Sequence, residues 1–163
     1  VTVRMGRADF DPEHLPAAVS ESVMVDYPLT IGEKTYSVTC VSVGNPHCVV
    51  FTEAIDGPEL EKIGPEFEFS PIFPERINTE FVRFIDDKTL RMRVWERGNG
   101  ETLACGTGAC AAVAAAVRKG MCDSGEEITV KLPGGDLVVQ CDPDGMLGLR
   151  GNAVVVYEGV FEY

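Results

Sequence analysis

Alternation of apolar and polar positions predicts β-structure over most of the chain. β-branched residues run through 35–43 and return at 49–52, which is the composition of strands. Gly44-Asn45-Pro46 lies between them, and because Pro46 has no N–H to donate to a strand ladder, we expect a loop or a bulge there. These positions predict two consecutive strands with a short connection.

Three later segments continue the strand pattern. Residues 79–85 and 89–96 predict a hairpin, and apolar and polar side chains alternate in its second strand as in a half-buried sheet. Residues 126–142 predict another hairpin, with Pro133-Gly134-Gly135 at its turn. Residues 146–163 are expected to supply the last strands.

One segment is strongly helical in character. Residues 106–117 carry no charge, and alanines occupy every face, so this helix has no polar side to present to solvent. It would be about 18 Å long, and Gly120 suits the left-handed residue that ends many helices. A shorter helix is expected within 56–70, with Asp56 as its cap before Pro58. The first helix is therefore expected in the middle of the domain.

Together these elements predict an α+β fold in which residues 1–163 form a single domain. We expect a mostly antiparallel, curved sheet wrapped around the alanine-rich helix, because small side chains let strands approach a helix closely on several sides. The 45% content of hydrophobic residues excludes a disordered chain. A domain of this size buries about two thirds of its unfolded surface, so its core needs no covalent staples.

The net charge restricts the kinds of molecule that this chain can bind, and the cysteine spacing bears on metal binding and on the redox state of the thiols. A formal net charge of −12 argues against nucleic acid and anionic membranes, because both are polyanions. No apolar run has the length of a membrane span, and the N-terminal residues do not resemble a signal peptide. The cysteines form no C-x-x-C pair, so we expect no metal site and predict reduced thiols in the cytoplasm, at Cys40, Cys48, Cys105, Cys110, Cys122 and Cys141.

Cys105 falls at the beginning of the predicted helix. The backbone N–H groups of Gly106, Thr107 and Gly108 have no helical partner there, and together with the helix dipole they attract an anion. That anion can be the Cys105 thiolate, whose pKa would then fall below the free value of about 8.5, or a carboxylate or phosphate of a ligand. The simpler interpretation is that the glycines form a tight turn and that Cys105 only fills space.

The same segment matches a second motif. Residues 106–111 fit the G-x-G-x-x-A pattern of dinucleotide-binding proteins, but that pattern requires a strand immediately before it within a βαβ unit. The nearest predicted strand ends near Glu96, and the flanking strands are expected to be antiparallel. Dinucleotide binding is therefore not predicted.

Polar residues at strand ends suit a small zwitterionic ligand. Arg97 can hold a carboxylate through two parallel hydrogen bonds, and Glu96 can hold an ammonium group. Asn45 and His47 lie in the break between two apolar strands, and Asn78 begins a strand. Each has a structural explanation when taken singly, such as a turn-forming asparagine or an exposed ion pair. Together they can hold the carboxylates and the amine of an amino acid.

Several stretches resemble the diaminopimelate epimerase family. They are GNPHCVVF at 44–51, INTEFV at 77–82, and the long RVWERGNGETLACGTGACAAVAAA at 93–116, accompanied by LPGG and the closing VVVYEGVF. The resemblance covers nearly the whole chain but only the second half of the family's sequence. It implies that 1–163 is a C-terminal domain, that the N-terminal domain with its own catalytic cysteine is absent here, and that a homodimer is compatible with the chain.

The resemblance also implies a role for each candidate residue. Cys105 would be one of two catalytic thiols of a cofactor-independent epimerase that interconverts LL- and meso-diaminopimelate, with Glu96 and His47 assisting at the reacting centre. The remaining substrate-binding groups would be Asn45, Asn78, Arg97, Gly106 and Thr107. Inverting a stereocentre needs a base on one face and an acid on the other, and without pyridoxal phosphate the developing charge must be held by fixed dipoles such as helix N-termini.

Three alternatives stay open at this point. The same fold can serve a different substrate, as in proline racemase or isomerases of the phenazine type. Cys105 and His47 can form a thiol hydrolase pair, with Gly106 and Thr107 as oxyanion donors. Finally, the domain can be a non-catalytic module that binds a ligand at the anion site.

Overall fold

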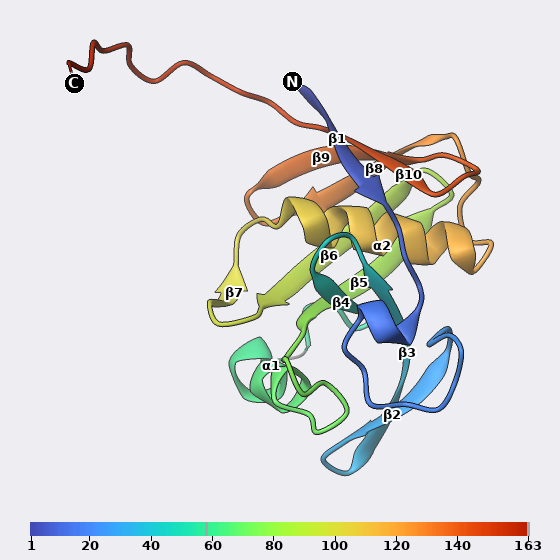
Figure 1. Cartoon of the computed structure of the whole chain (residues 1–163). Coiled ribbons are helices and arrows are strands. Elements are labelled where there is room, and N and C mark those ends of the chain that lie inside the picture. Colours follow the sequence, from blue (N-terminus) through green and yellow to red (C-terminus); the bar gives the residue numbers. More distant parts are fainter. Residues whose placement is uncertain (58, 163) are drawn as a thin grey trace.

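The computed structural model describes residues 1–57 and 59–162, in which a ten-stranded sheet accompanies two α-helices and one 3₁₀ turn (Figure 1). The helices are α1 (Leu60–Glu68) and α2 (Gly106–Arg118), and the 3₁₀ turn is Pro12–His14. The strands are β1 (Thr2–Arg7), β2 (Tyr27–Ile31), β3 (Lys34–Ser42), β4 (Pro46–Phe51), β5 (Asn78–Asp86), β6 (Thr89–Glu96), β7 (Gly100–Thr102), β8 (Glu127–Leu132), β9 (Gly135–Cys141) and β10 (Met146–Arg150).

The sheet is mixed. Its strands follow the order β1-β10-β9-β8-β6-β5-β4-β3-β2, and β7 pairs with β6. The pairs β4–β5 and β6–β8 are parallel, whereas the other pairs of named strands are antiparallel. The crossover between β4 and β5 contains α1, and the crossover between β6 and β8 contains α2, because parallel neighbours need a long connection. The expectation that the strands flanking this helix are antiparallel was therefore wrong for β6 and β8.

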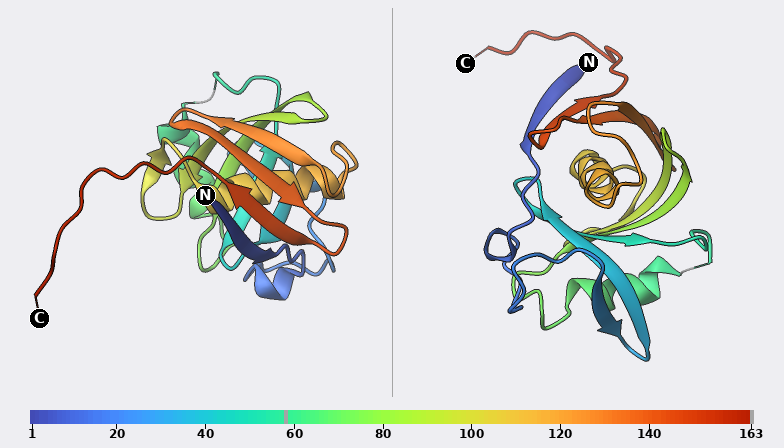
Figure 2. Two further views of the ribbon diagram at one scale, coloured as in Figure 1. Left: turned by 90° about the horizontal axis from the view of Figure 1, so that it is seen from above. Right: turned by 90° about the vertical axis from the view of Figure 1, so that its right-hand side faces the viewer.

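Helix α2 lies deep in the structure. Residues 108–116 are all buried, and α2 contacts strands from both halves of the sheet, including β3, β6 and β9. Figure 2 (right) shows it nearly end-on, with strands on several sides. The absence of charge that the sequence shows in this helix has its reason here, because a buried charge without a partner is costly. Gly120 follows the helix with φ +70°, as predicted.

Apolar side chains of strands β3, β4 and β5 pack into a hydrophobic core on each face of the sheet. Val41, Val49 and Val82 pack in the cluster that contains α2, while Val50 and Phe81 pack in a second cluster with α1. Successive residues of a strand point to opposite faces. This part of the sheet therefore separates the two helices and is apolar on both sides.

Most of the predicted strands are confirmed. The hairpins β5–β6 and β8–β9 lie where the sequence places them, and β3 covers nearly all of 35–43. The following strand begins earlier than predicted, at Pro46 rather than at 49. Pro46 is the first residue of β4, a position that tolerates proline.

Two predicted elements were wrong in part. Helix α1 has Glu59 as its N-cap residue, and Asp56 instead binds both terminal nitrogens of Arg91 at 2.7 Å; Pro58 lies outside the described residues. Residues 151–162 form no strand and run away from the domain as an extended tail (Figure 1). The apolar pattern of the tail is that of a strand, but a strand needs a paired neighbour.

Candidate active site

Cys105 occupies the N-cap position of α2. Its backbone is extended (φ −141°, ψ 111°), and its Sγ accepts a hydrogen bond from the Gly108 N–H at 3.3 Å. The side chain is only 8% exposed. The amides of Gly106 and Thr107 have no hydrogen-bond partner among the described contacts of residues 1–57 and 59–162. The predicted anion-binding geometry at this helix end is therefore present.

A chain of polar contacts leads from the sulfur into the core. Sγ of Cys105 lies 3.5 Å from Oγ1 of Thr107, which accepts a hydrogen bond from Nδ2 of Asn45 at 3.4 Å. Oδ1 of Asn45 lies 3.0 Å from Nε2 of His47. Nδ1 of His47 lies 2.6 Å from Oε1 of Glu80, and both of these side chains are fully buried. Three predicted site residues are thus joined to Cys105 through their side chains.

The side chain of Asn78 joins two backbone segments next to this chain of contacts by hydrogen bonds. Its Nδ2 donates to the carbonyl oxygen of Pro46 at 2.8 Å, and its Oδ1 accepts from the backbone N–H of Arg97 at 2.9 Å. The parallel register of β4 and β5 sets Asn78 beside His47. Asn78 therefore fixes the position of the residues around the site.

Glu96 and Arg97 lie at the end of β6 and are partly exposed. The Thr102 hydroxyl donates to the Glu96 carboxylate, and the Arg97 guanidinium donates to the carbonyl oxygen of Glu75 at 3.1 Å. No hydrogen bond among the described residues links the side chain of either residue to Cys105. Both side chains lie at the rim, next to the solvent.

Burial dominates the acidity of the Cys105 thiol. Desolvation raises its pKa above the ordinary value, the nearby charges of Glu80 and Glu96 act in the same direction, and the hydrogen bonds with Thr107 and Gly108 oppose the rise. The expected fall of the pKa below the free value was wrong for this chain, because the hydrogen bonds with Thr107 and Gly108 do not offset the loss of water. Cys105 is therefore protonated at neutral pH.

Glu80 and Glu68 are site-supporting residues that sequence reasoning missed. Glu68 accepts hydrogen bonds from Nε1 of Trp95 at 2.8 Å and from the backbone N–H of Gly98 at 2.9 Å, so it holds the loop before Cys105. Glu80 and Glu68 are each an acid within an apolar segment of the sequence. An acid placed among core residues is the signal that points to a buried partner.

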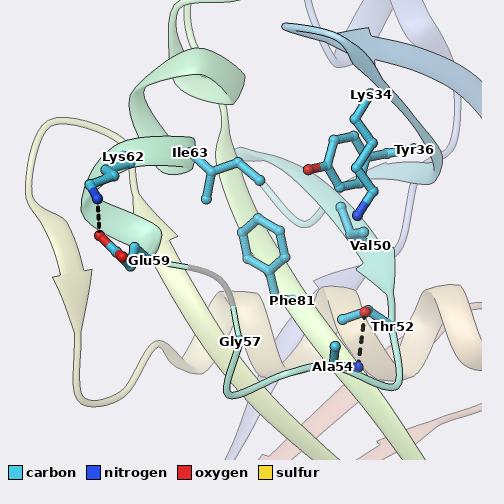
Figure 3. Close-up of a pocket in the computed structure, with 10 residues that line it drawn as sticks. All are labelled: Lys34, Tyr36, Val50, Thr52, Ala54, Gly57, Glu59, Lys62, Ile63 and Phe81. Atoms are coloured by element: carbon cyan, nitrogen blue, oxygen red, sulfur yellow. Dashed lines mark hydrogen bonds and ion pairs between the residues drawn. The ribbon is translucent and has the colours of Figure 1, made fainter.

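A separate cavity lies on the other face of the sheet. It has a volume of about 430 Å³ and is formed by β3, β4, β5 and α1, with Tyr36, Ile63 and Phe81 among the side chains in Figure 3. The ten lining residues drawn there include none of the site residues predicted from the sequence. This cavity is therefore distinct from the Cys105 site.

Within residues 1–57 and 59–162, no three His, Cys, Asp or Glu side chains are grouped as metal ligands. No helix in the described part of the chain is long and apolar enough to cross a membrane.

Comparison with known proteins decides the family. A family model described as diaminopimelate epimerase matches residues 39–159. The chain belongs to the diaminopimelate epimerase family. It is similar to the diaminopimelate epimerase of Thermosynechococcus vestitus, with 48% identity over 98% of this chain and 58% of that protein. It is also similar to that of Acetivibrio thermocellus, with 49% identity over 98% of this chain and 56% of that protein. The chain thus spans a little over half the length of these epimerase relatives.

Solved structures agree at the level of fold. A predicted epimerase from Pseudomonas aeruginosa superposes with a TM-score of 0.53 at 19% identity, over 96% of this chain and 58% of the other. A hydroxyproline epimerase from Agrobacterium vitis gives a TM-score of 0.59 at 15% identity, over 91% of this chain and 48% of the other. The mixed sheet with two helices therefore has the fold of such epimerases.

Proposed function

We propose that this chain is the C-terminal domain of a diaminopimelate epimerase and supplies one of its two proton-transferring thiols. Residues 1–163 would form that domain, with the sheet curved around α2. The relatives are nearly twice as long as the chain, which supports a second domain that carries the other thiol. The complete protein would interconvert LL- and meso-diaminopimelate without a cofactor, in the cytoplasm, where the six free thiols stay reduced.

The position of Cys105 carries this proposal. A thiol at the mouth of a buried helix faces amide N–H groups that can bind the carboxylate at the reacting carbon. Because burial raises its pKa, the resting group is a thiol and acts as the acid. It donates its proton to one face of the α-carbon while the thiolate of the other domain removes hydrogen from the opposite face, and the roles reverse in the other direction.

The remaining groups suit the ends of the substrate. The amides of Gly106 and Thr107 would hold the carboxylate next to Cys105, where the developing charge needs fixed dipoles. Asn45, Asn78 and Arg97 would hold the distal end.

Glu96 and His47 would assist near the reacting carbon. Glu96 lies close enough for its charge to act on the thiol, and His47 reaches the site through Asn45.

Hydrogen exchange at the α-carbon tests the function. The complete protein is incubated with diaminopimelate in D₂O, and deuterium incorporation is followed by mass spectrometry. Cys105→Ala should lose exchange by several orders of magnitude, whereas Cys110→Ala should retain it, because Cys110 is a buried core thiol of the same helix. Full exchange in Cys105→Ala would refute the proposal.

Two controls separate the alternatives. Proline and hydroxyproline are assayed in parallel, and exchange of these substrates in place of diaminopimelate would indicate the related racemases. Intact-mass measurement after substrate addition would reveal an acyl adduct on Cys105 if the pair with His47 were a hydrolase.

A further inference from the structure

Glu80 is the inner end of the chain of contacts that begins at Cys105. Its side chain is fully buried, Oε1 contacts Nδ1 of His47 at 2.6 Å, and Oε2 has no hydrogen-bond partner in the described part of the chain. An ionised carboxylate with one oxygen unpartnered is costly in the core unless a positive charge lies next to it. Among the residues that the structure describes, His47 is the one neighbour in hydrogen-bond contact that can provide this charge.

The hydrogen-bond partners of His47 determine which of its ring nitrogens carry a proton. Nδ2 of Asn45 donates to Thr107, so the amide presents Oδ1 to His47. Oδ1 can only accept, and Nε2 of His47 must therefore carry a hydrogen. On the other side of the ring, the 2.6 Å contact between Nδ1 and Oε1 of Glu80 has the length of a charge-assisted bond. Both ring nitrogens are then donors.

We propose that Glu80 is a positioning residue that holds His47 as a doubly protonated imidazolium. One ring N–H then binds Glu80, and from the other, on Nε2, each successive donor points toward the sulfur of Cys105. His47 donates to Asn45, Asn45 donates to Thr107, and the Thr107 hydroxyl is left to donate to Sγ. This orientation adds an O–H donor to the N–H of Gly108 at a developing thiolate. The consequence for catalysis rests on the proposed function, but the proton arrangement does not.

The opposite orientation has a different structure. If His47 carried a proton on Nδ1 alone, Nε2 would accept from Asn45, and the amide would turn by 180°. Oδ1 of Asn45 would then accept the Thr107 hydroxyl proton, and Sγ would lose that donor. The carboxylate at Glu80 decides between the two orientations because it stabilises the charged ring.

In the described part of the chain, the charge of Glu80 acts on titratable groups from two other elements. Cys48 on β4 and Cys105 at α2 are both within range of its charge, and desolvation raises the pKa of both thiols. Both are therefore neutral at pH 7.5. Glu80 and His47 are then the charged groups of this cluster.

Nitrogen NMR of the histidine rings tests the proposal. The chain contains two histidines, so ring nitrogens can be assigned with a single His14→Gln variant. At pH 7.5 we expect both His47 nitrogens to show shifts of protonated nitrogens. A proton found on Nε2 alone, with the other on Glu80, or on Nδ1 alone, would overturn the proposal.

Variants add a matched comparison. Glu80→Gln keeps the shape of the side chain and removes the charge. We expect His47 to keep the proton on Nδ1, which the amide oxygen of Gln accepts, and to lose the proton on Nε2. Asp9→Asn is the control, because Asp9 makes the equivalent 2.7 Å contact with His14 on the surface; it should leave the His47 signals unchanged. Two protonated nitrogens persisting in Glu80→Gln would also refute the role of Glu80.

Thiol reactivity gives the second readout. Iodoacetamide alkylation of Cys105 at pH 8, followed by mass spectrometry, should be slower in Glu80→Gln by roughly threefold, the effect of about half a pKa unit. A Glu80 that acted only as a nearby negative charge would make alkylation faster when removed. These measurements need no substrate, so the Glu80 proposal and the epimerase proposal fail separately.

Discussion

A Cβ atom at Gly108 would lie 2.7 Å from Oε1 of Glu80 and 3.2 Å from Sγ of Cys105. The backbone of α2 thus approaches the buried carboxylate so closely that no larger residue fits between it and the thiol. The N–H of Gly108 binds the sulfur, and its missing side chain leaves room for Glu80. Glycine is required here for space, and its φ is not in the left-handed region.

Gly108→Ala should destabilise the chain. Alanine favours a helix by about 1 kcal/mol over glycine, but overpacking against a buried carboxylate costs about 1–3 kcal/mol and also displaces His47. We expect a net loss in the free energy of unfolding, measured by urea denaturation. Gly148→Ala is the control, because a Cβ there meets nothing within 4 Å and should change stability little. Equal stability of the two variants would contradict the close approach.

The Thr107 hydroxyl should make Cys105 more reactive. Its hydrogen bond lowers the pKa of the Cys105 thiol against the larger effect of burial, so Thr107→Val should raise that pKa further and slow alkylation at pH 8 by several-fold. Thr107→Ser retains the hydroxyl and should react at nearly the original rate. If Thr107→Val reacts as fast as Thr107→Ser, the contact at 3.5 Å contributes nothing to the thiolate.

Buried thiols should make the fold sensitive to alkaline pH. Burial raises the pKa of Cys110 from 9.0 to about 12. Because the folded pKa exceeds the unfolded one, this thiol contributes its full stability below pH 9, and the contribution falls by about 1.4 kcal/mol per pH unit between pH 9 and 12. Between pH 9 and 11, the free energy of unfolding measured with urea should therefore fall by about 2 kcal/mol less in Cys110→Ala than in the unsubstituted chain. An identical pH dependence in the two proteins would refute this assignment.

The C-terminal tail should drive association of the isolated chain. Val154, Val156 and Val160 are 83%, 90% and 95% exposed. An exposed apolar segment in extended conformation can pair with a strand of another chain. Replacing these three valines with serine should lower the sedimentation coefficient at high concentration and reduce binding of a hydrophobic dye. An unchanged sedimentation coefficient and unchanged dye binding would show that the tail does not drive association.

Short stretches of consecutive residues were enough to predict α2, its N-terminus at Cys105 and two of the hairpins. The uncharged, alanine-rich run predicts α2, and the glycines beside Cys105 predict the amide-lined helix end. Both inferences succeed because a helix terminus and its cap depend on a few consecutive residues. The hairpins β5–β6 and β8–β9 are predictable for the same reason, since each depends on one turn.

Pairing between distant segments was not readable from local patterns. The parallel register of β4 and β5, with His47 beside Asn78, unites residues that are far apart in sequence. That pairing brings Glu80 into contact with His47. An acid among the apolar residues of this strand indicates a buried partner, but the local sequence does not show which residue that partner is. The tail has the apolar pattern of a strand but forms none in 151–162, because strand formation is decided by a neighbour.

The sequence by itself determined that an uncharged helix begins at a cysteine flanked by glycines, since those properties belong to adjacent residues. The tertiary structure decided the acidity of that cysteine and the identity of the groups behind it. Burial depends on what the whole chain packs around a site, and desolvation of Cys105 outweighs the local hydrogen bonds that favour its thiolate.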